Sequence, residues 1–390
     1  AGGVLGGVYI SNLVGDENVI TLDMGGTSTD IVLIHKGQIR LTTNGEIGNF
    51  PIKVPMIEMH TIGTGGGSIA WVDMGGTLRL GPESAGAMPG PACYGQEGKR
   101  PVVTDANLVL GRLDCKAFLG GEKPLYPEKA AAAIETEISN PLSLPVIEAA
   151  KGIIDISDAN MCGGVKVIST QKGYDLREFS LISFGGAGSL HAARIARELN
   201  MKRVIVPMYP GNFSAIGAEL AEVRYDYVRT LVQPVSEIGI ENYNNIFHDM
   251  IQEAVPHLME EGFKDNEIMM SGHADMRYEG QAWELSVGVP INIKDEAEFS
   301  NIINDFEEYH KKTYGYTLND SKVTIVNLRL SATGMIPKLE LKKHTITGHD
   351  AIEALKGKRS VYFDGKFTDT SIYNRDLLTP GNEVMGPAII

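Results

Sequence analysis

The sequence feature that most constrains the fold is a short polar turn between two apolar runs. The runs cover residues 19–22 and 31–34 and are rich in β-branched side chains. Between them lies Asp23-Met24-Gly25-Gly26-Thr27-Ser28-Thr29-Asp30. This pattern predicts a β-hairpin with a carboxylate at each end of its turn.

The chemistry of this turn favours a phosphate ligand. Successive N–H groups in a glycine-rich turn such as Gly25-Gly26 can converge on an anion, and the hydroxyls of Thr27 and Thr29 add donors. Asp23 and Asp30 would repel a bare phosphate, but beside a phosphate-bound Mg²⁺ each could bind the metal or hold its waters. The turn therefore predicts a nucleotide polyphosphate bound with its metal, while an ordinary hairpin turn stays open as the alternative.

Charge and composition exclude several classes of protein. The formal net charge of -14 over 390 residues argues against a general binder of nucleic acids or anionic membranes. No apolar run reaches membrane-spanning length. Three cysteines without metal-type spacing are typical of a reducing compartment, so we expect a cytoplasmic protein.

The length of the chain predicts more than one domain. Residues 1–115 alternate apolar runs with glycine-rich turns, and residues 181–206 include a strand, glycine turn, helix and strand in succession, which is typical of an α/β crossover. The composition changes after about Val232, and amphipathic helices then alternate with paired strands. We therefore predict an α/β domain over 1–232 and an α+β domain over 233–390, with a kink or break at Pro256 in the first helix of the latter.

A second glycine-rich loop, Gly65-Gly66-Gly67-Ser68, follows shortly after His60. Three consecutive glycines allow a backbone to approach a ligand closely. The loop could therefore face a phosphate or a substrate anion, or it could be a plain flexible turn.

A third glycine-rich segment includes Gly185, Gly186 and Gly188 and lies between an expected strand and an expected helix. That placement suits a nucleotide, since a ribose or phosphate can meet glycine backbone and a helix N-terminus there. The dinucleotide spacing G-x-G-x-x-G is absent from this segment. Tight packing of the strand against the helix would also require glycines, so that alternative stays open.

Two further residues, Cys93 and Asp105, are candidates for chemistry. No base for Cys93 is evident, so a buried structural thiol is the favoured interpretation. Asp105 could orient a metal or substrate as a catalytic residue, or it could cap the helix that begins there. The sequence does not decide between these two roles.

Several of these motifs together resemble known families. The loop 23–30 is similar to a phosphate hairpin of the actin, sugar-kinase and chaperone ATPases, and residues 181–191 are similar to their adenosine motif. More specifically, the chain resembles the hydantoinase A, N-methylhydantoinase and 5-oxoprolinase family, to which ATP-binding subunits of acetone carboxylases are related. The motifs that carry this resemblance occur in the family's order at residues 21–30, 60–68, 90–95, 183–188 and, more weakly, 277–281.

The resemblance implies a fold and a reaction. It implies an actin-like ATPase core with a ribonuclease H-like sheet, and ATP-dependent hydrolysis of a cyclic amide such as hydantoin, N-methylhydantoin or 5-oxoproline. In that reaction Asp23 and Asp30 would hold Mg²⁺ or Mn²⁺, and Asp105 is a further catalytic candidate. Phosphates would contact the glycines and hydroxyls of the first two loops, and the third loop would line the adenosine.

The resemblance also implies partners and rival functions. Family members usually begin with an N-terminal domain that is not found in this chain, and many act with a second, hydantoinase B-type subunit. The closest rival is the ATP-binding subunit of a ketone carboxylase. A rival of a different class is a nucleotide-binding module without catalysis.

Overall fold

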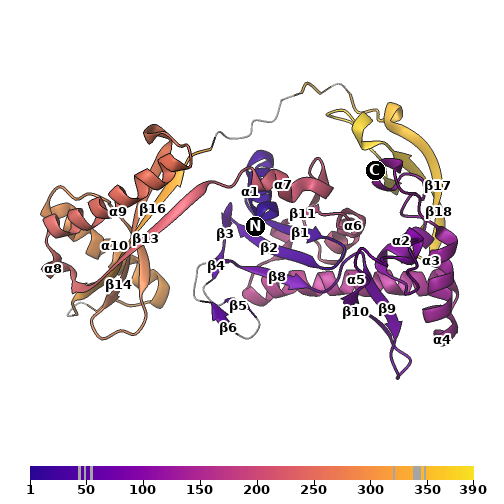
Figure 1. The fold of residues 1–390 in the computed structure, drawn as a ribbon, viewed down its shortest axis with the longest axis horizontal. Helices are drawn as coiled ribbons and strands as arrows, with labels where there is room; N and C mark the ends of the chain where they lie inside the picture. The colour runs from indigo at the N-terminus through magenta and orange to yellow at the C-terminus, as the bar shows by residue number, and fades with distance from the viewer. Residues whose placement is uncertain (43–44, 48–49, 53–55, 319–320, 337–343, 347) are drawn as a thin grey trace. The chain divides into compact units, whose positions relative to one another are not determined.

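The computed structural model describes residues 1–390 except 43–44, 48–49, 53–55, 319–320, 337–343 and 347 (Figure 1). Its contacts divide the chain into two compact units, one of residues 1–220 with 340–390 and the other of residues 221–339. The domains predicted from sequence, 1–232 and 233–390, differ from these units because residues 340–390 pack with the N-terminal part. Within the described residues, no helix combines the length and the apolar character that crossing a bilayer requires.

The first unit is built on a mixed sheet with the strand order β12-β11-β1-β2-β3, in which β8 also pairs with β2. Strands β1 and β2 are antiparallel, which confirms the predicted hairpin, whereas β11 runs parallel to both β1 and β12. The strands span Val19–Met24 (β1), Thr29–His35 (β2), Gln38–Ile39 (β3), Met59–Ile62 (β8), Ser180–Phe184 (β11) and Val204–Ile205 (β12).

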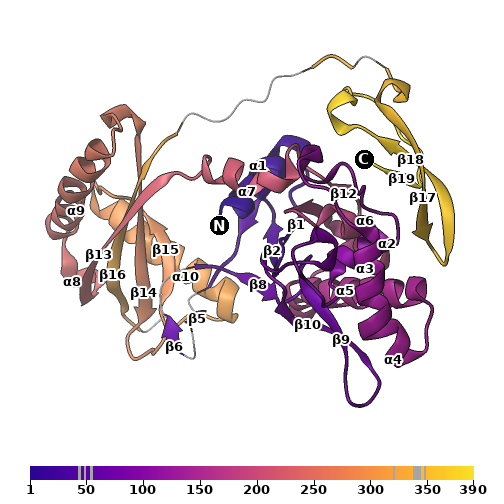
Figure 2. The same cartoon turned by 45° about the vertical axis from the view of Figure 1, so that its right-hand side comes forward.

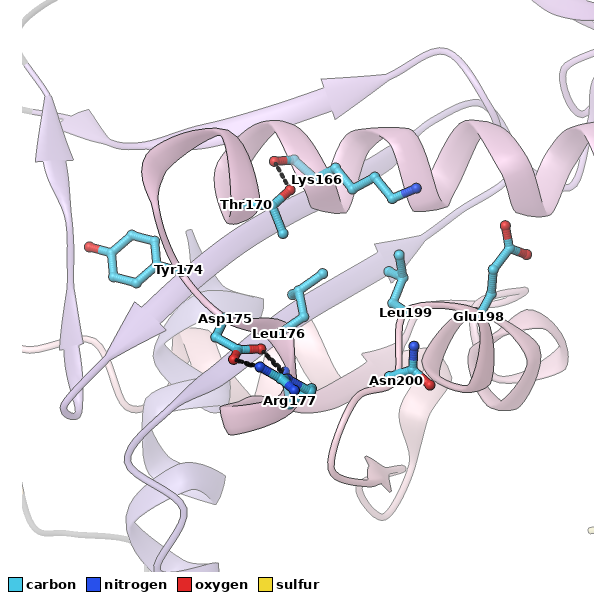
Figure 3. A pocket seen from close by; sticks show the side chains of 9 residues that line it. All are labelled: Lys166, Thr170, Tyr174, Asp175, Leu176, Arg177, Glu198, Leu199 and Asn200. Atoms are coloured by element: carbon cyan, nitrogen blue, oxygen red, sulfur yellow. Dashed lines mark hydrogen bonds and ion pairs between the residues drawn. The ribbon is translucent and has the colours of Figure 1, made fainter.

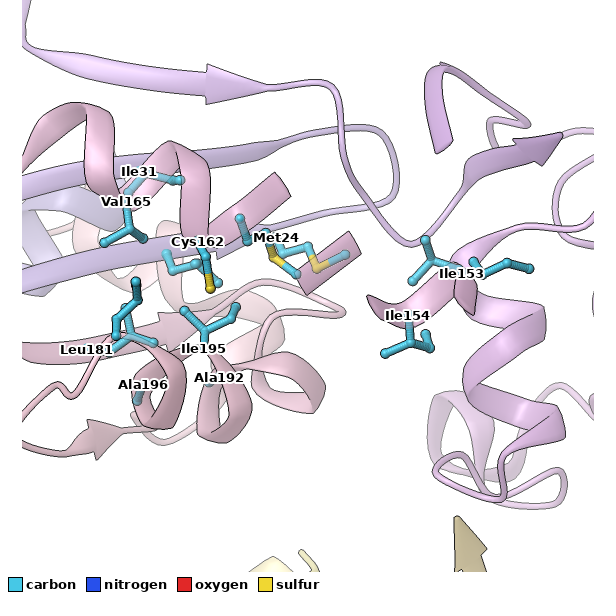
Figure 4. Close-up of a cluster of buried hydrophobic side chains, with 14 of the residues drawn as sticks. Met24, Ile31, Ile153, Ile154, Cys162, Val165, Leu181, Ala192, Ile195 and Ala196 are labelled. Atoms are coloured by element: carbon cyan, nitrogen blue, oxygen red, sulfur yellow. The ribbon is translucent and has the colours of Figure 1, made fainter. Parts of the chain in front are cut away.

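Helices cover both faces of this sheet because its strands are apolar on both sides. Ile20 and Leu22 of β1 lie in one core with side chains of α5 and α6, part of which Figure 4 shows, and Val19 lies in another core with α1 and α7. Such strands are typical of a sheet buried on both faces. The helices span Gly2–Val14 (α1), Val146–Ile168 (α5), Ser189–Glu198 (α6) and Phe213–Ala218 (α7). The predicted α/β fold class with an actin-like ATPase core is confirmed.

Further elements of the first unit surround this core. Tyr362 of β17 donates its backbone N–H to the carbonyl of Leu110 and its hydroxyl to Glu148, both over 2.9 Å, which explains why the C-terminal residues belong to this unit. These elements are β9 (Ser68–Val72), β10 (Leu78–Ser84), α2 (Val103–Val109), α3 (Pro127–Ile134), α4 (Asn140–Leu142), β17 (Leu355–Phe363), β18 (Lys366–Tyr373) and β19 (Ala388–Ile389). Short strand pairs lie at Leu41–Thr42 (β4) with Met56–Ile57 (β7) and at Gly45–Ile47 (β5) with Phe50–Ile52 (β6).

The second unit is an antiparallel sheet with the order β13-β16-β14-β15 and the helices α8, α9 and α10 (Figure 2). Aromatic side chains, including Tyr243, Phe247 and Phe306, fill its core. Of the predicted kink or break at Pro256, the break is wrong, since α9 continues through this residue. The elements span Val223–Pro234 (β13), Val235–Ile238 (α8), Ile240–Glu260 (α9), Ile268–Tyr278 (β14), Leu285–Val289 (β15), Glu296–Tyr314 (α10) and Val323–Gly334 (β16).

A buried carboxylate, Asp16, joins the start of the central sheet to β11 and β12. Burial alone would raise its pKa, but hydrogen bonds from Lys202, Ser180 and Arg203 outweigh burial and lower the pKa from 3.8 to about 2. The stabilisation is therefore complete above about pH 4 and is lost as the pH falls toward 2. We expect Asp16→Asn to lower the free energy of unfolding at pH 7 by about 1 kcal/mol, measured with urea. A difference between variant and wild type that stays constant from pH 7 to pH 3 would contradict this role.

Candidate functional site

The β1–β2 hairpin places two carboxylates side by side. Asp23 and Asp30 are direct partners in the antiparallel register, and the next pair is Met24 with Thr29. Directly opposed residues in a β-sheet point to the same face, so the two acids share one face. Asp23 also lies beside Phe184 of the parallel strand β11. The turn thus begins where the carboxyl ends of β1 and β11 meet, which is where ligands bind in open α/β sheets.

Asp23 is held in a partly buried position by a residue that sequence analysis missed. Ser214 of α7 donates its hydroxyl to Asp23 Oδ2 over 2.9 Å. Burial raises the pKa of Asp23, the Ser214 hydrogen bond opposes that shift, and the nearby charge of Asp30 adds to it. Ser214 follows Phe213 in a stretch without any motif, so only the folded chain could identify it.

Asp23 and Asp30 carry oxygen ligands of the kind that Mg²⁺ prefers. Thr61 of β8 donates its hydroxyl to Asp30 Oδ1 over 2.7 Å, leaving Asp30 Oδ2 and Asp23 Oδ1 without a hydrogen bond from the described residues. The described chain contains no group of three or more His, Cys, Asp or Glu side chains that could hold a metal. Mg²⁺ is commonly bound by one or two carboxylates together with phosphates and water. Asp23 and Asp30 therefore fit a metal that arrives with a nucleotide, and this role stays a prediction.

The loop 185–188 lies against the hairpin turn. The N–H of Ala187 donates to the carbonyl of Met24 over 3.0 Å. A Cβ on Gly185 would lie 2.4 Å from that same carbonyl oxygen and 2.6 Å from Asp23 Oδ1. Gly186 is exposed, whereas Gly188 is buried and a Cβ there would lie 2.4 Å from the carbonyl oxygen of Phe184. The structure therefore brings together the two loops that sequence analysis assigned to one nucleotide.

The loop Gly65–Ser68 packs directly against the backbone of the turn. Gly66 and Gly67 donate their N–H groups to the carbonyls of Gly25 and Gly26 over 2.9 and 2.6 Å. All four residues of the loop are buried, and a Cβ on Gly65 would lie 2.7 Å from the backbone of Gly26. Close packing is thus a sufficient reason for these glycines, and contact with phosphate or substrate stays a prediction.

This packing leaves donors free on the turn itself. Within the described chain, the N–H groups of Gly26, Thr27 and Ser28 donate no hydrogen bond to a protein acceptor. Gly26 and Thr27 are exposed, and Ser28 is partly exposed. Successive N–H groups of a turn that have no protein acceptor can donate to an anion. Thr29, in contrast, is buried and donates its hydroxyl to the carbonyl of Thr64 over 2.5 Å, so its predicted contact with phosphate has no support from this geometry.

Asp105 is buried and serves as a backbone anchor. Its carboxylate accepts N–H groups from Cys93 over 2.8 Å, from Val102 over 3.0 Å and from Ala92 over 3.2 Å. Burial raises the pKa of Asp105, and these hydrogen bonds oppose the shift. The Cys93 thiol is also buried, and burial next to Asp105 raises its pKa far above the ordinary value. The geometry favours the helix-capping role of Asp105 and a structural role for Cys93.

Replacing this anchor should destabilise the protein. We expect Asp105→Ala to lower the free energy of unfolding by about 2 kcal/mol, because three buried N–H groups lose their acceptor. Urea unfolding measures the change, and Asp105→Asn, which keeps one acceptor, should lose less stability. The rate at which the folded fraction of Asp105→Asn releases phosphate from ATP should stay within about threefold of the wild-type rate. A loss of turnover at unchanged stability would instead show the catalytic role.

A hollow of about 430 Å³ lies at the opposite end of the strand–helix unit (Figure 3). Its walls include Lys166 near the end of α5, Arg177 before β11 and Asn200 after α6. The loop 185–188, in contrast, follows the carboxyl end of β11 and precedes α6. The 10 residues of α6 separate the loop 185–188 from Asn200 by roughly 15 Å along the helix axis. The hollow is therefore separate from the candidate nucleotide site.

Comparison with known proteins identifies the family. Residues 1–227 match the family described as hydantoinase/oxoprolinase, and residues 236–390 match its C-terminal domain. The caprolactamase subunit alpha of Pseudomonas jessenii is 36% identical over 391 residues, which cover 98% of this chain and 56% of the relative. The chain spans about half the length of the curated relatives it matches.

Solved structures show the same fold. The nucleotide-free structure of acetone carboxylase superposes with a TM-score of 0.87 at 28% identity, covering 99% of this chain and 56% of that one. The ATP-dependent caprolactamase of Pseudomonas jessenii superposes with a TM-score of 0.74 at 35% identity, covering 96% and 55%. With two family models that together match nearly all of its residues, the chain belongs to the hydantoinase/oxoprolinase family.

Proposed function

We propose that this chain is the ATP-binding part of an enzyme that hydrolyses a cyclic amide at the expense of ATP. The observation that supports this most directly is the contact between the Asp23–Asp30 hairpin turn and the loop 185–188, because one nucleotide could then meet both. Membership of the family supports the reaction class, since its relatives include an ATP-dependent caprolactamase. Hydantoin, N-methylhydantoin, 5-oxoproline and related lactams are the candidate substrates.

In this proposal the chain contributes positioning and charge neutralisation, as in other phosphoryl transfers. The free N–H groups of Gly26 and Thr27 donate to phosphate oxygens, and Asp23 and Asp30 hold the accompanying Mg²⁺ or its waters. The backbone of Gly185 and Gly186 lines the adenosine. ATP, as co-substrate, transfers its γ-phosphoryl group to the amide oxygen and leaves as ADP. One water then adds to the activated carbon and the ring C–N bond breaks, and a second water releases the phosphate.

A ketone carboxylase subunit is the second candidate function. Of the two superpositions described above, the one with acetone carboxylase has the higher TM-score, 0.87 against 0.74. The same phosphate-binding arrangement would then serve the activation of bicarbonate or ketone. In either case we propose that the chain acts with a second, hydantoinase B-type subunit, because the relative from Pseudomonas jessenii is itself named as a subunit.

The deciding experiment measures phosphate released from ATP by the complete polypeptide together with its partner subunit. A panel of hydantoins, 5-oxoproline and lactams is compared with ketones supplied with bicarbonate. Stimulation by a cyclic amide without bicarbonate supports the amide hydrolase, and stimulation that requires bicarbonate and a ketone supports the carboxylase. Nucleotide binding without any stimulation in the assembled enzyme would support a non-catalytic module instead.

A further inference from the structure

Three buried polar side chains form a hydrogen-bonded network that joins three helices next to the candidate site. The Nδ1 atom of His191 in α6 lies 2.6 Å from Asp158 Oδ1 in α5, and its Nε2 atom lies 3.3 Å from Asn107 Nδ2 in α2. The exposed fractions of the three residues are 0%, 1% and 1%. Sequence analysis included His191 only as the last residue of the segment 181–191 and did not connect the three residues, because they are distant in sequence.

Each of these helices also holds one of the loops of the candidate site. Helix α6 follows directly after Gly188. Thr104 in α2 donates both its N–H and its hydroxyl to the carbonyl of Gly66, each over 2.8 Å. Asn160 in α5 donates to the Thr64 hydroxyl over 3.2 Å, and the carbonyl of Thr64 accepts the hydroxyl of Thr29. The hydrogen bonds of His191 therefore link the loop 185–188, which precedes α6, to residues 64–68, which contact α2 and α5 and pack against the turn 25–28.

The polar character of this link is informative because apolar side chains could fill the same volume. Replacing both members of a buried hydrogen-bonded pair by packed apolar residues is often neutral or stabilising, so such a pair is weak support for stability alone. Hydrogen bonds are directional, however, so a buried hydrogen-bonded link constrains the relative placement of the elements that it joins, although Asn107 Oδ1 and Asp158 Oδ2 accept no hydrogen bond within the described chain. Asp158 is further balanced by Arg194, whose Nη1 lies 3.4 Å from Asp158 Oδ2 and 2.6 Å from Asp155 Oδ1.

We propose that His191 is a positioning residue that holds the loop 185–188 in register with the turn 25–28 through its bonds to Asp158 and Asn107. This inference rests on the proposed function, in that both loops bind one ATP molecule. It predicts that breaking the link weakens ATP binding by more than the accompanying loss of stability explains.

The test compares two buried histidines in the complete polypeptide with its partner. His310 is the matched control, since it is 1% exposed and has two polar contacts, Gln281 Nε2 at 3.1 Å and the carbonyl of Tyr316 at 2.9 Å, but lies in the second unit. The variants are His191→Leu, His191→Asn and His310→Leu. For each, Tm is measured by calorimetry, and the Kd of magnesium ATP is measured by titration well below Tm. The KM for ATP is measured where turnover is present.

We expect His191→Leu and His310→Leu to lower Tm comparably, while only His191→Leu raises the Kd and KM for ATP, by about tenfold. His191→Asn can still donate to Asp158 but cannot reach Asn107, so its Kd for magnesium ATP should rise by only about threefold. Unchanged ATP affinity in His191→Leu, or an equal change in His310→Leu, would overturn the positioning role. If His191→Leu does not fold, Asn107→Leu removes the same bond that His191→Asn removes and should also raise the Kd by about threefold, whereas an unchanged Kd in Asn107→Leu would overturn the positioning role.

The same titration separates this inference from the proposed function. Wild-type protein that does not bind ATP would refute the proposed function and, with it, this role for His191. Wild-type protein that binds ATP, together with a His191→Leu variant that binds it equally well, would refute only the positioning role.

Discussion

Asp23→Asn should reduce substrate-stimulated phosphate release at least 100-fold in the assembled enzyme while the protein stays folded. Asparagine has the shape of aspartate and can still accept the hydrogen bond from Ser214. It cannot supply the negative charge that binds Mg²⁺ or orients its waters. A 100-fold loss corresponds to about 2.7 kcal/mol of transition-state stabilisation, a reasonable share for one charged group in a phosphoryl transfer.

The stability of the Asp23→Asn variant should be equal to or higher than that of wild type. Burial and the charge of Asp30 raise the pKa of Asp23, so its ionised form destabilises the native state at neutral pH. Asparagine removes that cost. For the same reason, the affinity of the metal-free protein for magnesium ATP should fall as the pH is lowered through the raised pKa of Asp23, because the protonated form cannot bind the metal.

Asp175→Asn is the control for this prediction. Asp175 lines the hollow at the opposite end of the strand–helix unit and pairs with Arg177. Its replacement should leave turnover unchanged. Equal turnover of wild type and Asp23→Asn would refute the proposed role of Asp23, whereas a folding defect in Asp23→Asn would show that its carboxylate is needed for structure.

The elements of the nucleotide-binding core could be predicted from the sequence because their signals are local. The hairpin of β1 and β2 follows from two β-branched runs around one turn, and the β11–α6 unit follows from an apolar run before Gly185. Strand pairing then brings Asp23 next to Phe184, so the contact between the two loops follows from the topology.

The supporting residues could not be predicted because their partners are remote in sequence. Ser214 reaches Asp23 across 191 residues, and His191 reaches Asn107 across 84. The sequence position of Asp105 is compatible with both catalysis and capping. Capping is favoured only by the three remote or neighbouring backbone N–H groups that its carboxylate accepts in the fold. The packing of residues 340–390 with the N-terminal part likewise depends on remote contacts, such as that of Tyr362 with Glu148.

Gly185→Ala should destabilise the protein by about 3 kcal/mol or more and abolish nucleotide binding. Gly185 has φ of +83°, where a Cβ atom is strained by about 1–2 kcal/mol. The added methyl group would also lie 2.4 Å from the carbonyl oxygen of Met24, and relieving such a contact typically costs about 1–3 kcal/mol. Relief requires moving either the loop 185–188 or the end of β1 that bears Asp23, which would separate the two parts of the proposed site.

The neighbouring Gly186 offers a matched comparison because it is exposed and a Cβ there would meet no atom within 4 Å. Gly186→Ala should therefore change the free energy of unfolding by no more than about 0.5 kcal/mol. Urea unfolding and titration with magnesium ATP compare the two variants directly. A Gly185→Ala variant as stable as Gly186→Ala would show that the backbone around Asp23 can rearrange freely. If it also bound ATP as tightly, the fixed contact between the hairpin turn and the loop 185–188 could not be what creates the nucleotide site.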